Sequence, residues 1–226
     1  MSSPQGEIFA PLGTALTRTD LVIEAVRNAI LSGNLKPGAA LVERTLAEEL
    51  KVSKTPVREA LIALARNGLI DMTRNRGATV RELTVQDVLD VYQARLLLEP
   101  WAIFEAVQRG IPQSSLEQAE DLLNQSDAAG GEQAQAIRAQ ANRNFHRIMV
   151  KHSGNPLIIN AIEQVQDLAA LGATAFIWPT SPTWEKESQE HRAILAAAQA
   201  QDADKAKGLL ETHIQTSIQR IVDLQK

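Results

Sequence analysis

The sequence has no cysteine and few aromatic residues among its 226 positions. The absence of cysteine excludes disulfide bonds, thiolate nucleophiles and cysteine-ligated zinc sites, and it fits a protein of the reducing cytoplasm. Aromatic residues make up 4% of the chain, too few for a protein whose main activity is to stack on single-stranded nucleic acid. Function must therefore come from carboxylates, amides, hydroxyls, cations and the four histidines.

Long hydrophobic runs are also missing. The first residues, MSSPQGEIFAPLG, lack the basic start and apolar segment of a signal peptide. The most apolar later stretch, LAALGATAFIW, is shorter than a bilayer-spanning helix requires. We therefore expect a cytoplasmic protein with no membrane partner.

Negative charge prevails over the whole chain, with a formal net charge of -4, but it is unevenly distributed. Residues 18–82 hold 11 Lys and Arg against 8 Asp and Glu, a net of +3, whereas residues 83–226 hold 12 against 18, a net of -6. A basic part beside an acidic part indicates two domains with different partners. The sequence predicts a flexible leader at 1–16, one domain at 17–82 and a second at 83–226.

Periodicity separates the same two domains. Two helices, around LVIEAVRNAIL and ERTLAEEL, precede a third that begins within KVSKTPVREALIALARNGLI, and the β-prone LIDMTRNRGATVREL follows as a hairpin. Three helices and a hairpin in this order are typical of a winged helix-turn-helix. The second domain is predicted to be all-α, so the fold class of the whole chain is mainly α. Pro100 is expected to kink or interrupt the first helix of this domain. Its expected helices are 84–109, 113–128, 132–152, 156–176, 184–200 and 203–224.

The start of the third helix carries the first functional signal. Ser53 can cap the helix, while Lys54 and Arg58 lie four residues apart on a face that the apolar stripe does not use. Cations at the positive end of a helix dipole are unfavourable by about 0.3 to 1 kcal/mol each. They become favourable when an anion such as a DNA phosphate binds there. A solvated face with scattered charge is the alternative interpretation of this helix alone.

Residues 17–82 contain, in this order, the motifs G-x-L-x-P-G, LAxxL, VSxTPVREAL and GL followed by RG. On these motifs, the segment resembles the winged helix-turn-helix of the GntR family of bacterial transcriptional regulators. The resemblance implies binding to double-stranded operator DNA. The implied DNA contacts are Arg44, Ser53, Lys54, Thr55, Arg58, Arg76 and Gly77. Two positions depart from the family pattern. Lys51 stands where Gly is usual, which predicts a positive φ at a non-glycine residue, and Lys54 replaces a commoner Arg, which gives a point charge in place of a bidentate fork.

Three of the four histidines project along or beside the buried stripe of a predicted helix, namely His146, His191 and His213. A histidine in such a place is usually a hydrogen-bonded core residue, and this is the alternative for each of them. Three imidazoles from antiparallel helices can instead converge inside a bundle and hold a divalent metal ion such as zinc or nickel. The fourth, His152, precedes the helix-ending SGNP and is expected to be exposed.

The remainder of the chain, residues 84–224, resembles the FCD effector domain of the FadR branch of the GntR family, on the motifs ARLLLE, NRNFH, SGNP, EHRAIL and THI. The metal ligands implied by this resemblance are Asn142, His146, His191 and His213. Metal-binding members usually have Asp where Asn142 stands, and a neutral amide oxygen is a weaker ligand than a carboxylate. Arg95 matches a family arginine that would hold an anionic effector. An ion pair with Glu99, four residues on, is the alternative for Arg95.

Together these features predict a ligand-responsive transcriptional regulator that binds a palindromic operator as a homodimer, with a small carboxylate as effector. Two alternatives remain open. A histidine-bound metal could activate water in a hydrolase-like domain, but Glu190 adjoins His191 and is expected on another face, so that no base is well placed. The helical domain could also be a passive, metal-stabilised dimerisation module. We expect no enzymatic activity.

Overall fold

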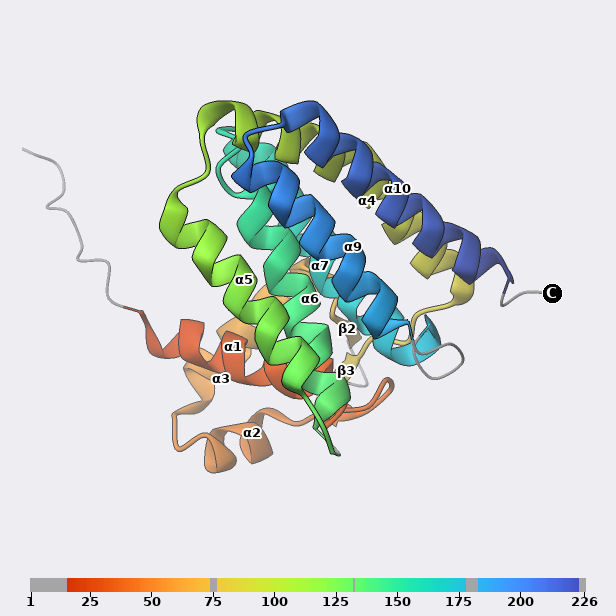
Figure 1. The fold of residues 1–226 in the computed structure, drawn as a ribbon. Helices are drawn as coiled ribbons and strands as arrows, with labels where there is room; N and C mark the ends of the chain where they lie inside the picture. Colours follow the sequence, from red (N-terminus) through yellow and green to blue (C-terminus); the bar gives the residue numbers. More distant parts are fainter. Residues whose placement is uncertain (1–15, 74–76, 132, 178–182, 224–226) are drawn as a thin grey trace, which may run out of the picture.

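The computed structural model of the chain describes residues 16–73, 77–131, 133–177 and 183–223. The predicted leader, except for Leu16, lies outside the described residues. Figure 1 shows a small head, α1 to β3, at one end of a larger helical bundle, α4 to α10. The elements of the head are α1 (Arg18–Leu31), β1 (Ala40–Leu41), α2 (Glu43–Glu49), α3 (Lys54–Arg66), β2 (Ile70–Thr73) and β3 (Gly77–Val80). Those of the bundle are α4 (Val85–Arg109), α5 (Gln113–Ala128), α6 (Ala134–Val150), α7 (Pro156–Gly172), η1 (Ala173–Ile177), α9 (Trp184–Gln199) and α10 (Ala203–Asp223).

The head has the predicted three helices and hairpin, and one further short strand. Thr17 and Asp20 form a capping box that starts α1. β2 and β3 pair antiparallel, with Ile70 opposite Val80, and β1 pairs with the other edge of β3 to give the sheet order β1-β3-β2. The sequence analysis missed β1 because a strand of two residues is too short to show an alternating pattern.

The third helix of the head is held by its apolar stripe. Val57, Leu61 and Leu64 are at most 1% exposed, and α3 packs against α1 and β2. Ser53 is the N-cap residue, as predicted, but its side chain makes no cap hydrogen bond, so the expected capping bond is absent. In the turn before α3, Lys51 has a φ of 54°, which confirms the left-handed conformation expected there.

The bundle begins with α4, whose first turn carries a capping box between Thr84 and Asp87. This helix runs without a pause through Pro100, which is buried. Because α4 packs against α10 and α7, tertiary contacts maintain the helix across a residue that lacks an N–H donor. Of the two outcomes predicted at Pro100, the pause does not occur.

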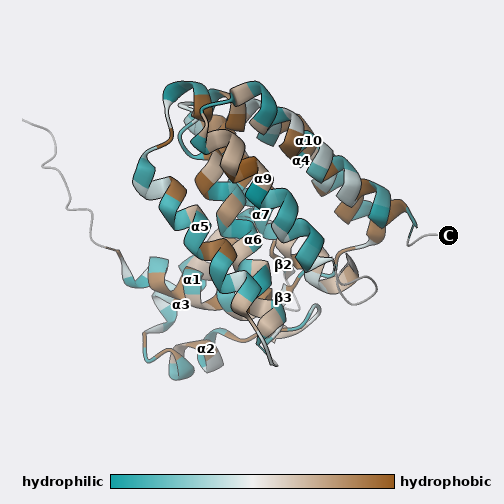
Figure 2. Cartoon of the chain, in the orientation of Figure 1, coloured by the Kyte–Doolittle hydropathy of each residue, from teal (hydrophilic) through white to brown (hydrophobic). Residues whose placement is uncertain are grey.

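The other helices close around α6. It packs against α5, α7 and α4, while α9 packs against α10 and α5. α7 ends at Gly172, and Ala173–Ile177 continue as a π-helical turn, where the sequence predicted one helix to residue 176. Figure 2 shows that the helices mix hydrophilic and hydrophobic residues, as an amphipathic bundle requires. Within the described residues, no helix is long and apolar enough to cross a membrane.

Candidate functional site

The described DNA contacts among those predicted lie at the start of α2, at the start of α3 and in β3, and Figure 1 shows α2 on the side of the head away from the bundle. Arg44 lies in the first turn of α2, and Lys54, Thr55 and Arg58 lie in the first turns of α3. All four side chains are exposed. Three cations therefore lie on the surface of the two helices that form the helix-turn-helix.

Two of these cations are already paired. Arg58 donates two hydrogen bonds to Glu43, from Nε (2.9 Å) and from Nη2 (2.8 Å), and Nε of Arg44 donates to Glu48 (3.0 Å). The hydrogen bond from Arg58 lowers the pKa of Glu43, which keeps this carboxylate ionised. If Arg58 contacts DNA, a phosphate would compete with Glu43 for its guanidinium.

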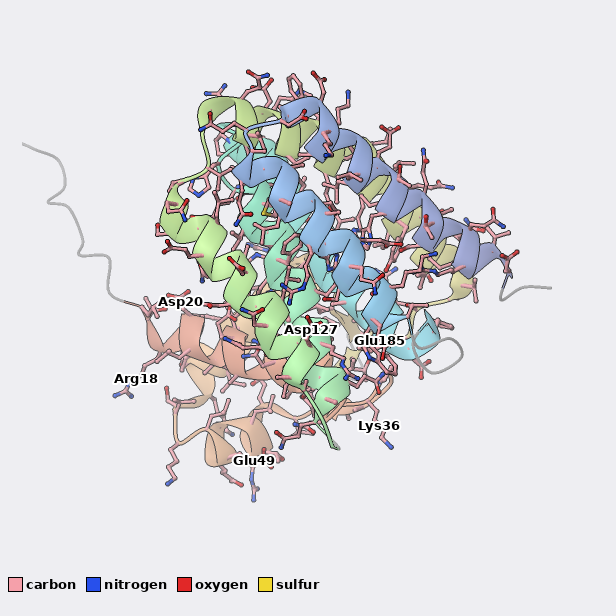
Figure 3. The ribbon with its side chains drawn as sticks, viewed as in Figure 1. Arg18, Asp20, Lys36, Glu49, Asp127 and Glu185 are labelled. Atoms are coloured by element: carbon pink, nitrogen blue, oxygen red, sulfur yellow. The ribbon has the colours of Figure 1, made fainter. Side chains whose placement is uncertain are left out.

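The hairpin of β2 and β3 would be the wing. Gly77 begins β3 with a φ of 75°, and a Cβ at this position would meet no atom within 4 Å. Backbone conformation, and not crowding, therefore favours glycine here. Arg76 lies outside the described residues. Figure 3 shows further charged side chains of both signs on the head, Arg18, Lys36 and Glu49 among them.

Three histidines from three helices meet in the interior of the bundle. His146 lies on α6, His191 on α9 and His213 on α10, and they are 1%, 3% and 4% exposed. One nitrogen of each ring lies within 4.8 Å of the others, and the Nε2 atoms of His146 and His191 are 3.2 Å apart. The expected convergence of the three rings is thus observed. His152, expected to be exposed, is half-buried and lies 3.1 Å from the Ser115 hydroxyl.

Two carboxylates orient two of the rings. Glu99 on α4 accepts a hydrogen bond from Nδ1 of His146 (2.8 Å), and Glu190 on α9 accepts one from Nδ1 of His213 (2.6 Å). A proton on Nδ1 leaves the lone pair of Nε2 as the metal-binding atom of each ring. Glu190 therefore contacts the cluster through His213. Glu190 was expected on another face than His191, and the sequence analysis did not anticipate its contact with His213.

Two of the three imidazoles are neutral at neutral pH. Burial lowers the pKa of His146 to about 4, although Glu99 acts in the opposite direction. Burial and the neighbouring His213 and His146 hold the pKa of His191 well below its usual value. Burial raises the pKa of Glu99, but Arg95 and His146 outweigh it and bring the value down to about 2. Neutral rings beside an ionised carboxylate can bind a cation without first losing a proton.

Asn142 lies one turn before His146 on α6. Its Oδ1 atom is buried and has no hydrogen-bond partner within the described residues, an arrangement that is uncommon in folded proteins. Asn142 and His191 line the same recess. Coordination of a cation would satisfy this oxygen, and three imidazole nitrogens with one oxygen are a ligand set that fits a divalent ion of the zinc or nickel type.

Arg95 is held inside the cluster. It is 1% exposed, its Nε donates to Oε1 of Glu99 (2.8 Å), and its Nη2 lies 3.2 Å from Nε2 of His146. The ion pair with Glu99, the alternative for this arginine, is therefore present. Arg95 could contact an effector only if its ion pair with Glu99 opened. A cation bound at Nε2 of His146 would also require Nη2 of Arg95 to move away from that nitrogen.

Arg138 is a second cation near the cluster, and the sequence analysis did not identify it. It stacks over Trp184, with 4.3 Å from Cζ to the ring centroid, and donates to the carbonyl of Ala129 (2.8 Å). It also lines the recess that Asn142 and His191 share. This recess lies between α5, α6 and α9, so no local sequence pattern marks Arg138 as part of a site.

Comparison with known proteins identifies both parts of the chain. Residues 18–80 match the bacterial regulatory proteins of the gntR family, and residues 90–216 match the FCD domain. The FCD match alone spans more than half of the 226 residues. This protein is a GntR-family transcriptional regulator with an FCD domain. Family membership makes it a DNA-binding regulator and not an enzyme, as the sequence analysis expected.

Other transcriptional regulators resemble this GntR-family chain over most of their length. The HTH-type transcriptional regulator McbR of Escherichia coli is 30% identical over 85% of this chain and 87% of its own. The Nta operon transcriptional regulator of Aminobacter aminovorans is 26% identical over 86% and 90%. The structure of E. coli McbR/YncC covers 94% of this chain and 100% of its own, with a TM-score of 0.78 and 25% identity. The combination of this head and this bundle in one chain is therefore also found in the structure of E. coli McbR/YncC.

Proposed function

We propose that this GntR-family regulator binds operator DNA as a homodimer, and that a small carboxylate bound at a divalent metal ion in the bundle changes its DNA affinity. The observation that supports this proposal best is the cluster of three buried imidazoles beside the unpartnered oxygen of Asn142. A bound zinc or nickel ion would supply positive charge and an open coordination position for a carboxylate.

The neutral ligand set favours an anionic effector. His146, His191 and His213 would hold the ion, and Asn142 would add an uncharged oxygen where an aspartate would cancel one of its charges. The full charge of the ion then remains to attract a carboxylate. Arg138, at the recess, would meet a second anionic group of the effector through its guanidinium.

Operator contacts would come from the exposed edge of the head. The first turn of α3 presents Lys54, Thr55 and the Ser53 hydroxyl, which makes no cap bond, to the phosphates and base edges of one major groove. Arg44 and Arg58 would leave their carboxylate partners and pair with DNA phosphates instead. Arg76 and Gly77 would contact DNA from the wing. One head makes too few contacts for operator affinity, so a homodimer on a palindromic site is expected.

DNA affinity with and without ligand tests the proposal. Duplexes selected from a random pool serve as operator, and binding is measured for chelator-treated protein, zinc-loaded protein, and zinc-loaded protein with acetate, lactate or malonate. At least one carboxylate should change the affinity of the zinc-loaded wild type for the duplex by about 5- to 150-fold, the usual range of allosteric coupling. The change should vanish in His191→Ala and persist in the matched control His152→Ala. A zinc-loaded protein that responds to no carboxylate would point to a passive dimerisation module.

A further inference from the structure

Head and bundle meet where α1 packs on α6 and α7. Arg27 of α1 is 8% exposed; its Nε donates to Oδ2 of Asp167 on α7 (2.9 Å), and its Nη1 pairs with Glu24. Gln140 of α6 donates to Asn28 of α1 (3.3 Å). A cavity of about 410 Å³ lies at the same junction, between the end of α1 and residues of α6, α7 and η1. Buried polar contacts at this junction therefore lie beside an apolar core that runs from the head into the bundle.

Asp167 joins the head to the helix that carries two of the proposed metal ligands. Its Oδ1 accepts a hydrogen bond from Nε of Arg143, and Arg143 follows Asn142 directly on α6 and precedes His146 by three residues. Asp167 is 1% exposed, so these guanidinium groups, and not water, balance its charge. One buried carboxylate thus links α1 of the head to α6 of the bundle.

The preceding residue, Gln166, contacts the metal site through Glu99. Its Nε2 donates to Oε1 of Glu99 (2.5 Å), and Oε2 of Glu99 accepts from Nδ1 of His146 (2.8 Å). Successive residues of an α-helix point about 100° apart, so Gln166 and Asp167 leave α7 toward different neighbours. α7 therefore carries one contact to the metal site and one contact to the head on adjacent residues.

We infer that Gln166 and Asp167 form a relay through which the metal site sets the position of the DNA-binding head; this inference rests on the proposed function. A ligand that shifts His146 also shifts Glu99, and the buried bond from Gln166 ties α7 to that movement, since a lost partner inside the bundle is not replaced by water. Displacement of α7 moves Asp167 and with it Arg27. Exposed ion pairs could not do this, because solvent takes over their contacts.

Hydrogen-exchange mass spectrometry on the full chain tests the relay without a known operator or effector. Exchange is compared between chelator-treated protein and protein with zinc alone. In the wild type, zinc should slow exchange in α6, α9 and α10 and also change exchange in α1 by about fivefold or more, the lower end of usual coupling. In Asp167→Asn, the response of the three bundle helices should remain and that of α1 should disappear.

Glu163→Gln is the matched control for Asp167→Asn. Glu163 is another carboxylate of α7, and its ion pair, with Arg147 of α6 (2.6 Å), does not involve the head. This variant should keep the zinc response of α1. Arg27→Gln removes the contact from the side of the head while the pair of Arg143 with Asp167 stays, so it should also abolish the α1 response, and it keeps the test decisive if Asp167→Asn does not fold.

Each outcome has a distinct meaning. Zinc protection of the bundle with no change in α1 of the wild type overturns the relay, as does an α1 response that survives both Asp167→Asn and Arg27→Gln. No zinc effect on any helix of the wild type contradicts the metal site itself and removes the input that the relay needs. Loss of the α1 response in Glu163→Gln as well would show that any weakening of α7 suffices, which also overturns a specific role for Asp167.

Discussion

The surface of α2 and α3 in the head and the interior of the bundle use their charged residues in opposite ways. In the head, the side chain of Arg58 is 64% exposed and its partner Glu43 is 29% exposed. In the bundle, the side chains of Arg95 and Glu99 are 1% and 0% exposed and share bonds with His146. Exposed pairs contribute little to stability and exchange partners readily, whereas a buried charge depends on the partner it has. Exchangeable contacts suit DNA binding, and fixed contacts suit a preorganised ligand site.

Among the single substitutions, removal of the Glu99 charge should have the largest effect on stability, because it leaves Arg95 buried without its counter-ion. Glu99→Gln is expected to lower the free energy of unfolding by about 3 to 5 kcal/mol, as for other broken buried pairs. Urea denaturation of the metal-free protein measures the loss. Glu105→Gln, which breaks a more exposed pair with Arg109 on the same helix, should cost less than about 1 kcal/mol. Equal losses would contradict the contrast between buried and exposed charge.

Substitutions on the exposed edge of the head should spare stability and weaken DNA binding. Lys54→Ala and Arg58→Ala should each cost about 1 to 3 kcal/mol of binding free energy, roughly 5- to 150-fold in affinity. Fluorescence anisotropy on the selected duplex measures the change. Arg66→Ala, at the other end of α3 and also exposed, is the matched control, and a comparable loss there would refute the assigned surface.

Acid should destabilise the metal-free bundle. The pKa of His146 is about 4 in the folded protein and that of His191 is also lowered, while both lie near 6.5 in an unfolded chain. The unfolded state therefore binds protons first as the pH falls, so the stability is present above about pH 6.5 and is lost toward pH 4. The slope is at most about 1.4 kcal/mol per pH unit for each histidine. Urea unfolding that is flat between pH 7 and pH 5 would show that the rings are not buried and neutral.

Release of Arg58 from its carboxylate partner Glu43 should have the smallest effect, a modest gain in DNA affinity. Glu43→Gln removes the competitor for the guanidinium, so DNA affinity should rise by up to about fivefold, the strength of an exposed pair. The same anisotropy assay measures it. A fall in DNA affinity would mean that Glu43 orients Arg58 for DNA. It would contradict the view that the exposed pair of Arg58 and Glu43 is an exchangeable contact.

The head was largely predictable because its signals are local. The three-helix and hairpin pattern follows from neighbouring residues, and the left-handed conformation of Lys51 follows from the resemblance to the family, which usually has Gly there; both are present. The missing cap bond of Ser53 and the pairing of Arg58 with Glu43, fifteen residues earlier, depend on how α2 and α3 pack. Sequence periodicity does not contain that information.

The bundle site was only half predictable. Helical periodicity places His146, His191 and His213 on inward faces, and these rings do meet. The partners that orient and connect them, such as Glu190, Gln166 and Asp167, act between helices that are distant in sequence. Their roles depend on the rotation of each helix about its axis, which a pattern of apolar residues fixes too coarsely to assign individual contacts.

The metal content of untagged protein tests the central claim most directly. Wild type, His191→Ala/His213→Ala and the control His152→Ala are purified, equilibrated with zinc, freed of unbound metal and analysed by mass spectrometry. A site of three imidazoles and one amide oxygen predicts about one divalent ion per chain in the wild type and in His152→Ala, and none in the double variant. Wild-type protein without a divalent ion, or equal metal in all three proteins, would contradict the account.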